Sequence, residues 1–204
     1  MRTASILIAA LAIAVAGCNN SSPTPPGGTP GVAPTPTVTL RAPGTGTVPA
    51  LVVTSTAFAT NTTVPTPEAQ NGCGGTNVSP DLTWTGAPAA TKSFAITEFD
   101  ADAPTGTGFW HWVLYNIPPN VTSIAAGAGT NPPAGTSGLS DYGSLGYGGP
   151  CPPVGDGTHH YAFTISALDT LLTGMPPSTT GAFLTFNMRG HIIAQGTYLG
   201  LFSR

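Results

Sequence analysis

Apolar and polar residues alternate along several stretches of this chain in the way typical of β-strands. Segments 92–99 and 161–168 alternate well enough to place their apolar side chains on one face of a sheet. Segment 51–58 is rich in β-branched residues, and 110–117 is a dense aromatic and aliphatic run. Gly, Pro, Asn or Asp flanks each segment, as expected where strands end in turns. The pattern therefore predicts a largely antiparallel β domain with long loops.

One helix is predicted, near the C-terminus, over residues 182–195. Its apolar side chains follow helical spacing only approximately, and Gly181 and Gly196 stand at its two ends. A last strand is expected over 198–202. The expected fold class is mainly β, with this helix at the periphery.

The first 17 residues have the pattern of a bacterial export signal. Arg2 supplies the positive charge, and the apolar run that follows is shorter than the roughly 20 residues needed to span a bilayer. The run ends in Val-Ala-Gly-Cys at 15–18, which resembles a lipobox, the motif whose cysteine becomes lipidated. The alternative is an ordinary signal peptide followed by a chance cysteine. We predict a lipoprotein signal peptide over 1–17 and a lipid anchor on Cys18.

Residues 18–49 are predicted to be a tether between this anchor and a domain at 50–204. Eight prolines and five glycines, interleaved with Thr and Ser, leave no apolar periodicity from which to build a core. The predicted location is the bacterial cell envelope. Asn19 stands where an Asp would mark retention at the inner membrane under the enterobacterial sorting rule, so the outer membrane is favoured.

Composition narrows the possible partners. Charged residues make up 6% of the 204-residue chain, against about 25% in an ordinary globular protein. Five Lys and Arg residues and a net charge of −3 provide no cationic cluster to displace counterions, which excludes nucleic acid as a partner. Apolar residues make up 40% of the chain, too many for a wholly disordered protein. A surface of Thr, Ser, Asn and Gly suits an extracytoplasmic β protein.

Most residues with useful chemistry gather at three predicted strand ends. They are Asp100 and Asp102, His111, and the group Gly149, Pro150, His159 and Tyr161. Loops at the ends of a rigid sheet are where binding groups usually lie. The connection between Asp102 and His111 is short enough to bring these side chains together. The sequence therefore predicts one cleft that holds carboxylates, imidazoles and a tyrosine hydroxyl.

Five short motifs resemble those of the phosphatidylethanolamine-binding protein family, and more narrowly its bacterial Raf-kinase-inhibitor-like YbhB/YbcL branch. They are the segment 77–84, Asp-Ala-Asp-Ala-Pro at 100–104, His111-Trp112, Gly-Pro-Cys-Pro-Pro at 149–153 and His-His-Tyr at 159–161. The resemblance covers about 58–204. It implies a large antiparallel sheet packed on a smaller one, and a pocket for phosphate-type anions or phospholipid head groups. The implied pocket residues are Asp100, Asp102, His111, Gly149, Pro150, His159 and Tyr161.

Two residues depart from the family pattern. Ala101 replaces the usual Pro between the two aspartates, which loosens the fixed φ of that loop. His160 replaces the usual Arg, which removes a permanent cation near the site.

Acidic residues can hold an anion if one of them keeps a proton. Asp100 and Asp102 lie two residues apart and share one face of an extended chain, so they resist double ionisation. A histidine imidazolium and the Gly149 N–H would supply two further donors. These donors predict weak, pH-sensitive binding without Lys or Arg.

Cys73 and Cys151 remain after Cys18 is set aside. An even pair in an exported domain favours a disulfide, which would join two pocket loops, and the alternative is two free buried thiols.

His191 is interpreted as structural. The remaining loop acids, Asp141, Asp156 and Asp169, are interpreted as loop or cap residues.

Three functions are compatible with these features. The first is a membrane-anchored module that binds a small anion or phospholipid head group and regulates an unknown protein partner. The second is a hydrolase or metal-dependent enzyme that uses the Asp and His residues, although no HExxH, GxSxG or comparable signature occurs. The third is a structural envelope lipoprotein with a vestigial pocket. We expect the first, with no cofactor, no metal and no catalysis.

Overall fold

The computed structural model describes residues 48–204. The predicted signal peptide, the lipidation site at Cys18 and most of the predicted tether lie outside the described residues. Val48 packs against a hydrophobic cluster, and the Pro49 carbonyl accepts a hydrogen bond from the Gln195 N–H at 3.0 Å. The described fold therefore includes two residues that the sequence assigned to the tether. Within the described range, no helix has the length and apolar character to cross a membrane.

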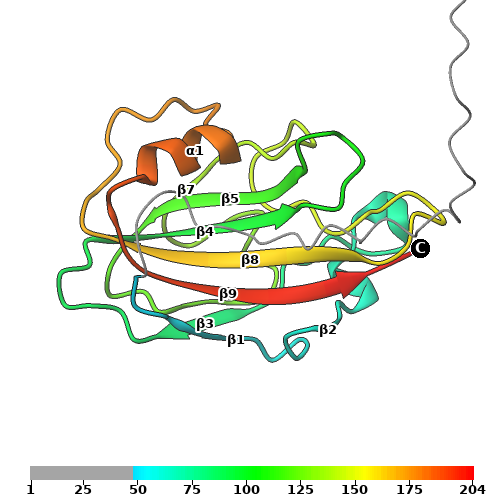
Figure 1. Cartoon of the computed structure of the whole chain (residues 1–204), viewed down its shortest axis with the longest axis horizontal. Helices are drawn as coiled ribbons and strands as arrows, with labels where there is room; N and C mark the ends of the chain where they lie inside the picture. The colour runs from blue at the N-terminus through cyan, green and yellow to red at the C-terminus, as the bar shows by residue number, and fades with distance from the viewer. Residues whose placement is uncertain (1–47) are drawn as a thin grey trace, which may run out of the picture. The chain divides into compact units, whose positions relative to one another are not determined.

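Two sheets make up the described domain (Figure 1). The larger sheet has the strand order β2 (Thr62–Thr63), β9 (Ile192–Phe202), β8 (His159–Leu168), β4 (Ser93–Asp100), β5 (Phe109–Ile117) and β7 (Thr136–Ser137). The smaller sheet has the order β1 (Val52–Thr54), β3 (Leu82–Thr85) and β6 (Ser123–Ile124). Among the pairs of named strands within 48–204, β2 with β9 is parallel and the others are antiparallel. The mainly β fold class and the two-sheet architecture are confirmed.

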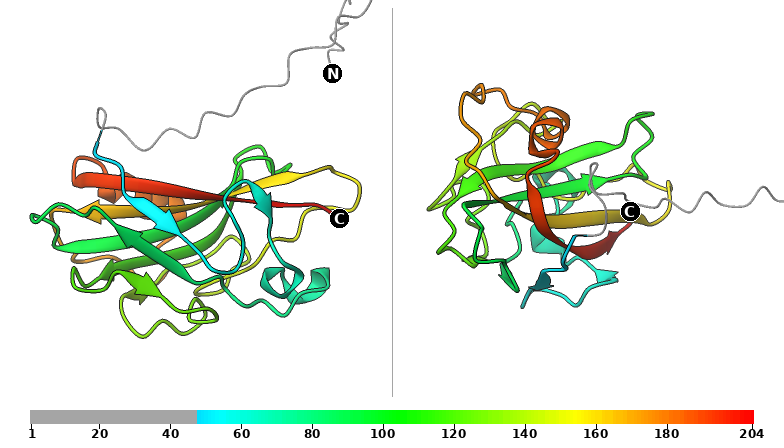
Figure 2. Two further views of the ribbon diagram at one scale, coloured as in Figure 1. Left: turned by 90° about the horizontal axis from the view of Figure 1, so that it is seen from below. Right: turned by 60° about the vertical axis from the view of Figure 1, so that its left-hand side comes forward.

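The larger sheet is covered on both faces. One hydrophobic cluster joins it to the smaller sheet and includes Trp84 and Trp112. The helix α1 (Gly181–Met188) lies over β5 on the other face (Figures 1 and 2). Its Leu184 and Met188 belong to a second cluster that includes Val113 of β5. Because both faces are covered, nearly every residue of β4 is buried. Two 3₁₀ turns, η1 (Thr66–Glu68) and η2 (Asn71–Cys73), precede the smaller sheet's second strand.

The predicted helix is correct in place and wrong in length. It spans Gly181–Met188, with the Thr180 hydroxyl accepting a hydrogen bond from the Phe183 N–H at its start. At Gly190 the backbone has φ +87°, a left-handed conformation that glycine adopts without strain. The segment predicted as the end of the helix instead begins β9, which pairs with β8 along its whole length. Tertiary pairing thus overrides a weak helical pattern.

The first strand is also shorter than predicted. Residues 52–54 pair with β3, after which Ser55 and Thr56 hydrogen-bond to the Asp81 carboxylate at 2.9–3.1 Å. This side chain draws the backbone away from the sheet, so the β-branched run at 51–58 forms a strand over only three residues.

Candidate functional site

Three strand ends meet at one edge of the larger sheet. Asp100 is the last residue of β4 and lies opposite Phe109, the first residue of β5, and opposite Tyr161 on β8. The Asp100 Oδ1 atom accepts hydrogen bonds from the N–H groups of Asp102 at 2.9 Å and Ala103 at 3.2 Å. This carboxylate therefore both ends the strand and starts the turn that leads to β5.

A β-bulge aims His111 into the site. Glu98 pairs with Trp112 and Phe99 pairs with Trp110, so His111 is an extra residue in β5. A bulge lets two successive side chains lie on the same side of a sheet. Trp112 consequently stays in the core between the sheets while His111 lies at the adjoining cavity. Sequence spacing alone does not reveal this arrangement.

These residues enclose a cavity of about 210 Å³. This is smaller than the roughly 300–1,000 Å³ of pockets for drug-sized ligands, and it suits a head group or small ion. Its polar side chains are Asp100, Thr105, His111, Tyr142, His159 and Tyr161, and the remaining wall is formed by Ala103, Pro104, Phe109, Cys151, Pro152 and Pro153. Four of the seven predicted residues, namely Asp100, His111, His159 and Tyr161, line the cavity.

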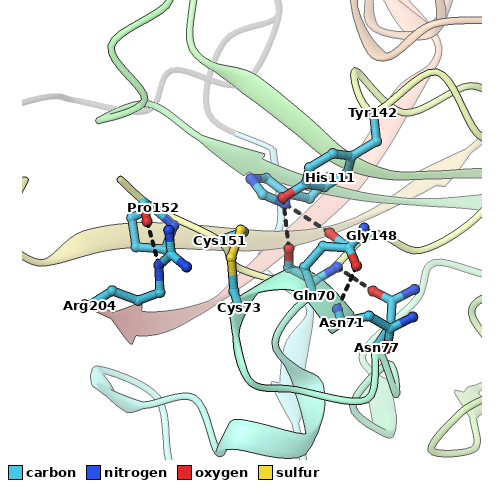
Figure 3. Close-up of a disulfide and its surroundings, with 11 residues drawn as sticks. Gln70, Asn71, Cys73, Asn77, His111, Tyr142, Gly148, Cys151, Pro152 and Arg204 are labelled. Atoms are coloured by element: carbon cyan, nitrogen blue, oxygen red, sulfur yellow. Dashed lines mark hydrogen bonds between the residues drawn. A yellow bond between two sulfur atoms is a disulfide. The ribbon is translucent and has the colours of Figure 1, made fainter. Parts of the chain in front are cut away.

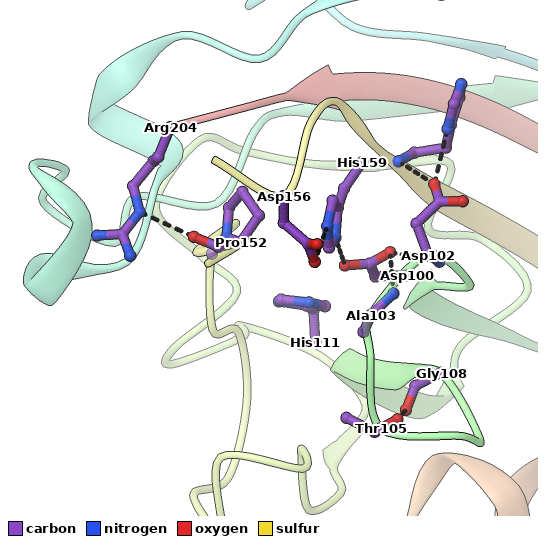
Figure 4. A network of polar contacts seen from close by, with 12 residues as sticks. Asp100, Asp102, Ala103, Thr105, Gly108, His111, Pro152, Asp156, His159 and Arg204 are labelled. Carbon is purple, nitrogen blue, oxygen red and sulfur yellow. Dashed lines mark hydrogen bonds and ion pairs between the residues drawn. The ribbon is translucent and has the colours of Figure 1, made fainter. Parts of the chain in front are cut away.

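His159 is held between two carboxylates (Figure 4). Its Nδ1 atom lies 2.7 Å from Asp100 Oδ2, and its Nε2 atom lies 3.2 Å from Asp156 Oδ2. Burial by itself lowers the pKa of His159, but the hydrogen bonds to Asp100 and Asp156 and the charges of Asp100 and Asp102 outweigh it and raise the pKa. Both ring nitrogens then carry protons that they donate to these carboxylates.

His111 has the opposite chemistry. Its side chain is buried, and Nδ1 lies 2.8 Å from the Gly148 carbonyl, which can only accept. Burial lowers the pKa of His111, although the Gly148 carbonyl and the charge of Asp100 act against this shift. A neutral ring with the proton on Nδ1 leaves Nε2 as an acceptor. The two cavity histidines therefore differ: the His111 ring supplies an acceptor and the His159 ring supplies a cation.

The other three predicted residues do not line the cavity. Asp102 Oδ2 accepts a hydrogen bond from the His160 N–H at 2.8 Å and lies 2.7 Å from His160 Nδ1. Each of the two aspartates is thus paired with its own histidine, and Asp100 and Asp102 do not act as a carboxylate pair. Because His160 stands where the family usually has Arg, an imidazole and not a guanidinium lies beside Asp102.

Gly149 and Pro150 connect loops behind the cavity. The Gly149 N–H donates to Asn77 Oδ1 at 2.7 Å, so it is not available to a ligand as the sequence suggested. A Cβ on Gly149 would lie 1.9 Å from the Glu68 carbonyl oxygen, which requires glycine at this position. The Pro150 carbonyl accepts from the Gln70 N–H at 3.1 Å. These two residues hold the loops in place, and neighbouring residues form the cavity wall.

The predicted disulfide between Cys73 and Cys151 is confirmed (Figure 3). The two Cα atoms are 5.5 Å apart, within the range that a disulfide spans. Cys73 ends η2, and Cys151 lies in the cavity wall. The bond therefore reinforces the Asn77–Gly149 contact between the same two loops.

Sequence reasoning missed three residues at this site. Asp156, interpreted as a loop acid, hydrogen-bonds to His159. Tyr142 lines the cavity and donates its hydroxyl hydrogen to the Gly149 carbonyl at 3.0 Å. The fully buried Glu98 has no hydrogen-bond partner for either carboxyl oxygen among the described residues. The spacing of Asp156 three residues before His159 was a usable signal, whereas the loop position of Tyr142 gave none.

Two histidine or aspartate groups that the sequence marked as structural do not line the cavity. His191 pairs with Asp169 at 2.8 Å on the surface, and Asp141 accepts from the Trp110 N–H at 2.8 Å, as expected for structural residues. Within residues 48–204, no group of three or more His, Cys, Asp or Glu residues has the geometry to hold a metal ion.

Comparisons with known proteins agree with the fold and its motifs. A family model described as phosphatidylethanolamine-binding protein matches residues 54–203. The Escherichia coli protein YbcL is 44% identical over 128 residues, which cover 60% of this chain and 70% of YbcL. The putative lipoprotein LppC of Mycobacterium tuberculosis is 38% identical over 176 residues, covering 84% of this chain and 81% of LppC.

Solved structures lead to the same group of proteins. The crystal structure of E. coli YbcL, described as a new member of the mammalian PEBP family, has a TM-score of 0.72 at 38% identity. It covers 76% of this chain and 98% of YbcL in the crystal. A putative phosphatidylethanolamine-binding protein homologue from Chlamydia trachomatis has a TM-score of 0.67 at 32% identity, with coverage of 76% and 98%.

Proposed function

The chain belongs to the phosphatidylethanolamine-binding protein family, in its YbhB/YbcL branch, and we propose that its cavity binds a phosphate-type head group without converting it chemically. One observation carries this proposal: His111, whose pKa is lowered by burial, and His159, whose pKa is raised by its carboxylate partners, line the same cavity with Asp100 and Tyr161. This set combines donors for an anionic oxygen with acceptors for a protonated group.

The donors that suit an anion are the His159 imidazolium and the Tyr161 hydroxyl. The Tyr161 oxygen is buried, and no described residue accepts its hydroxyl hydrogen. Burial raises the pKa of Tyr161 further above its ordinary value, so the hydroxyl keeps its proton. Hydrogen bonds of this kind to a charged group contribute about 1.5–3 kcal/mol each.

The acceptors suit a hydroxyl or an ammonium group on the same ligand. His111 Nε2 offers a lone pair, and Asp100 offers carboxylate oxygens at the cavity floor. A head group that joins a phosphate to an amine, such as phosphoethanolamine, would satisfy both kinds of group. The proline and phenylalanine walls would then exclude water from these contacts.

Calorimetric titration with phosphoethanolamine and inorganic phosphate tests this function. His159→Ala and His111→Ala should each weaken binding by roughly 10- to 150-fold, because each removes one hydrogen bond to a charged or polar group of the ligand. His191→Ala is the matched control, since this histidine also pairs with an aspartate but lies outside the cavity. Failure of the wild-type protein to bind either probe would refute the proposal.

We also propose that the domain works at a membrane, tethered through a lipid on Cys18. The lipobox and the Pro-rich segment after it support this location. So does the resemblance to LppC, a protein named as a putative lipoprotein. In this proposal, the tethered domain binds a protein partner in the envelope differently when a ligand fills its pocket.

A further inference from the structure

The best anion donor of the cavity already has an anionic partner. His159 Nε2 lies 3.2 Å from Asp156 Oδ2, so the imidazolium proton that a ligand oxygen would accept is directed at a carboxylate of the protein. The other side-chain N–H donor at the cavity, His111 Nδ1, is used by the Gly148 carbonyl. An incoming anion therefore meets a competitor at His159.

The two carboxylates on His159 are held very differently. Asp100 makes a 2.7 Å contact, and its side chain is 3% exposed. Asp156 makes a 3.2 Å contact, and its side chain is 41% exposed. Ion pairs in contact with water contribute little, about 0–1 kcal/mol, whereas separating a buried pair costs several. Asp156 is thus the partner that an external anion can replace.

The chain around Asp156 is built to let this side chain leave. Every residue from 153 to 158 is exposed, and the glycines on both sides, Gly155 and Gly157, have φ of +82° and +91°. The local backbone contacts are the Gly155 N–H to Arg204 carbonyl bond at 2.9 Å and the Asp156 N–H to Pro153 carbonyl bond at 3.2 Å. Movement of this loop therefore uncovers no part of the hydrophobic core.

We propose that the Asp156 carboxylate, which lies against His159 Nε2 beside the cavity, takes the place of a ligand's anionic oxygen and that a ligand binds by displacing it (Figure 4). Asp156 is then a residue that determines affinity, and the ligand's anionic oxygen is the group that takes its place. This inference rests on the proposed head-group function. It adds the position of the ligand's anionic oxygen and the protein group that opposes it.

The test is a calorimetric comparison of the full-length protein and its Asp156→Asn variant at pH 7. Two probes are used: phosphoethanolamine, and glycerophosphoethanolamine as the soluble head group of the lipid. Asp156→Asn should bind the recognised probe about three- to tenfold more tightly, because the amide is a weaker competitor for the imidazolium. The probe with the higher affinity identifies whether a free phosphate ester or a lipid head group is the source.

Two further variants separate displacement from a general effect of charge. Asp169→Asn removes a carboxylate from the His191 pair on the surface and should leave affinity unchanged. In a His159→Gln background, Asp156→Asn should give no gain, because the group for which the two anions compete is absent. Asp156→Ala is a second variant of the same residue, and it should bind the probe more tightly to a similar extent. It keeps the test valid if the asparagine of Asp156→Asn changes the loop.

The outcomes distinguish this inference from the function on which it rests. If the wild-type protein binds a probe and the Asp156 variants bind it no more tightly, the displacement inference is wrong and the head-group function stands. A gain that persists undiminished in the His159→Gln background also overturns it. If neither the wild-type protein nor any Asp156 variant binds either probe, both proposals fail.

Discussion

Glu98 is a carboxylic acid enclosed in the core beside the cavity. Its side chain is fully buried next to Trp112, and its two oxygens have no hydrogen-bond partner among the described residues. Burial, together with the nearby charge of Asp100, raises its pKa well above the ordinary value. The folded protein therefore favours the protonated form of Glu98. The unfolded chain releases this proton as the pH rises through the ordinary pKa of a glutamic acid.

Glu98→Gln should raise the free energy of unfolding at pH 7 by about 1–2 kcal/mol, because the buried acid must take up a proton on folding at this pH whereas the amide is neutral at every pH. The destabilisation by Glu98 begins as the pH rises through its unfolded pKa and grows until the folded pKa is reached. Near pH 4 the two proteins should be equally stable. Urea unfolding at both pH values measures this, and an equal difference at pH 4 and pH 7 would contradict the role given to ionisation.

The cavity histidines differ in how they should respond to pH. His159 has a raised pKa, so its imidazolium persists above the ordinary histidine range and is lost as the pH rises through the raised value. Affinity for phosphoethanolamine should fall about five- to tenfold between pH 7 and 9, where the phosphate is already almost fully ionised. Calorimetry across this range measures the change.

The fall in affinity between pH 7 and 9, called the pH step below, can be assigned to one histidine by mutation. His159→Gln should abolish the step, because no cation remains to be titrated. His111→Gln should bind more weakly and keep the step, because burial lowers the pKa of His111 and keeps that ring neutral throughout. A step that disappears in the His111 variant would reverse the assignment.

Among the elements, the loops behind the cavity depend on the disulfide. Cys73–Cys151 closes a loop with a sequence separation of 78 residues. The chain-entropy model gives about 4.5 kcal/mol for such a loop, and measured values are nearer 2–4 kcal/mol. Replacing both cysteines with alanine should lower the melting temperature by several degrees or more, as measured by calorimetry.

The disulfide variant also tests how the cavity wall is supported. Asn77 still joins the same loops through Gly149 and the Tyr147 carbonyl, so the double alanine variant should remain folded and bind its ligand more weakly. A melting temperature equal to that of the wild-type protein would show that these hydrogen bonds suffice without the bond between sulfurs.

For the whole molecule, the proposed lipid anchor on Cys18 would determine where the pocket works. Cys18→Ser should release the domain from the membrane fraction or leave an unprocessed precursor there, because the lipidated cysteine is absent. Membrane fractionation with immunoblotting checks this outcome. A variant that is processed and sorted like the wild-type protein would rule out the lipid anchor. Lipid attachment through several acyl chains would hold the domain stably, whereas one chain is marginal.

The sequence by itself determined the class of fold and most of the cavity's polar residues. The alternating segments 92–99 and 161–168 identified β4 and β8, and the dense apolar run 110–117 identified β5. These strands are covered on both faces, so they are rich in apolar residues whatever their partners. Asp100, His111, His159 and Tyr161 were found because they stand at the ends of these strands. The Cys73–Cys151 pair followed from the even cysteine count of an exported domain.

Tertiary structure alone decided the partners and the protonation of these residues. The bulge that turns His111 inward depends on the pairing of β5 with β4, and the strand at 192–202 exists because β8 offers it a partner. Asp102 and the Gly149 N–H were drawn away by His160 and Asn77, which lie 58 and 72 residues distant in the chain. Hydrogen bonds and burial depend on neighbours in space, so a pattern along one chain cannot assign the acceptor at His111 or the competitor at His159.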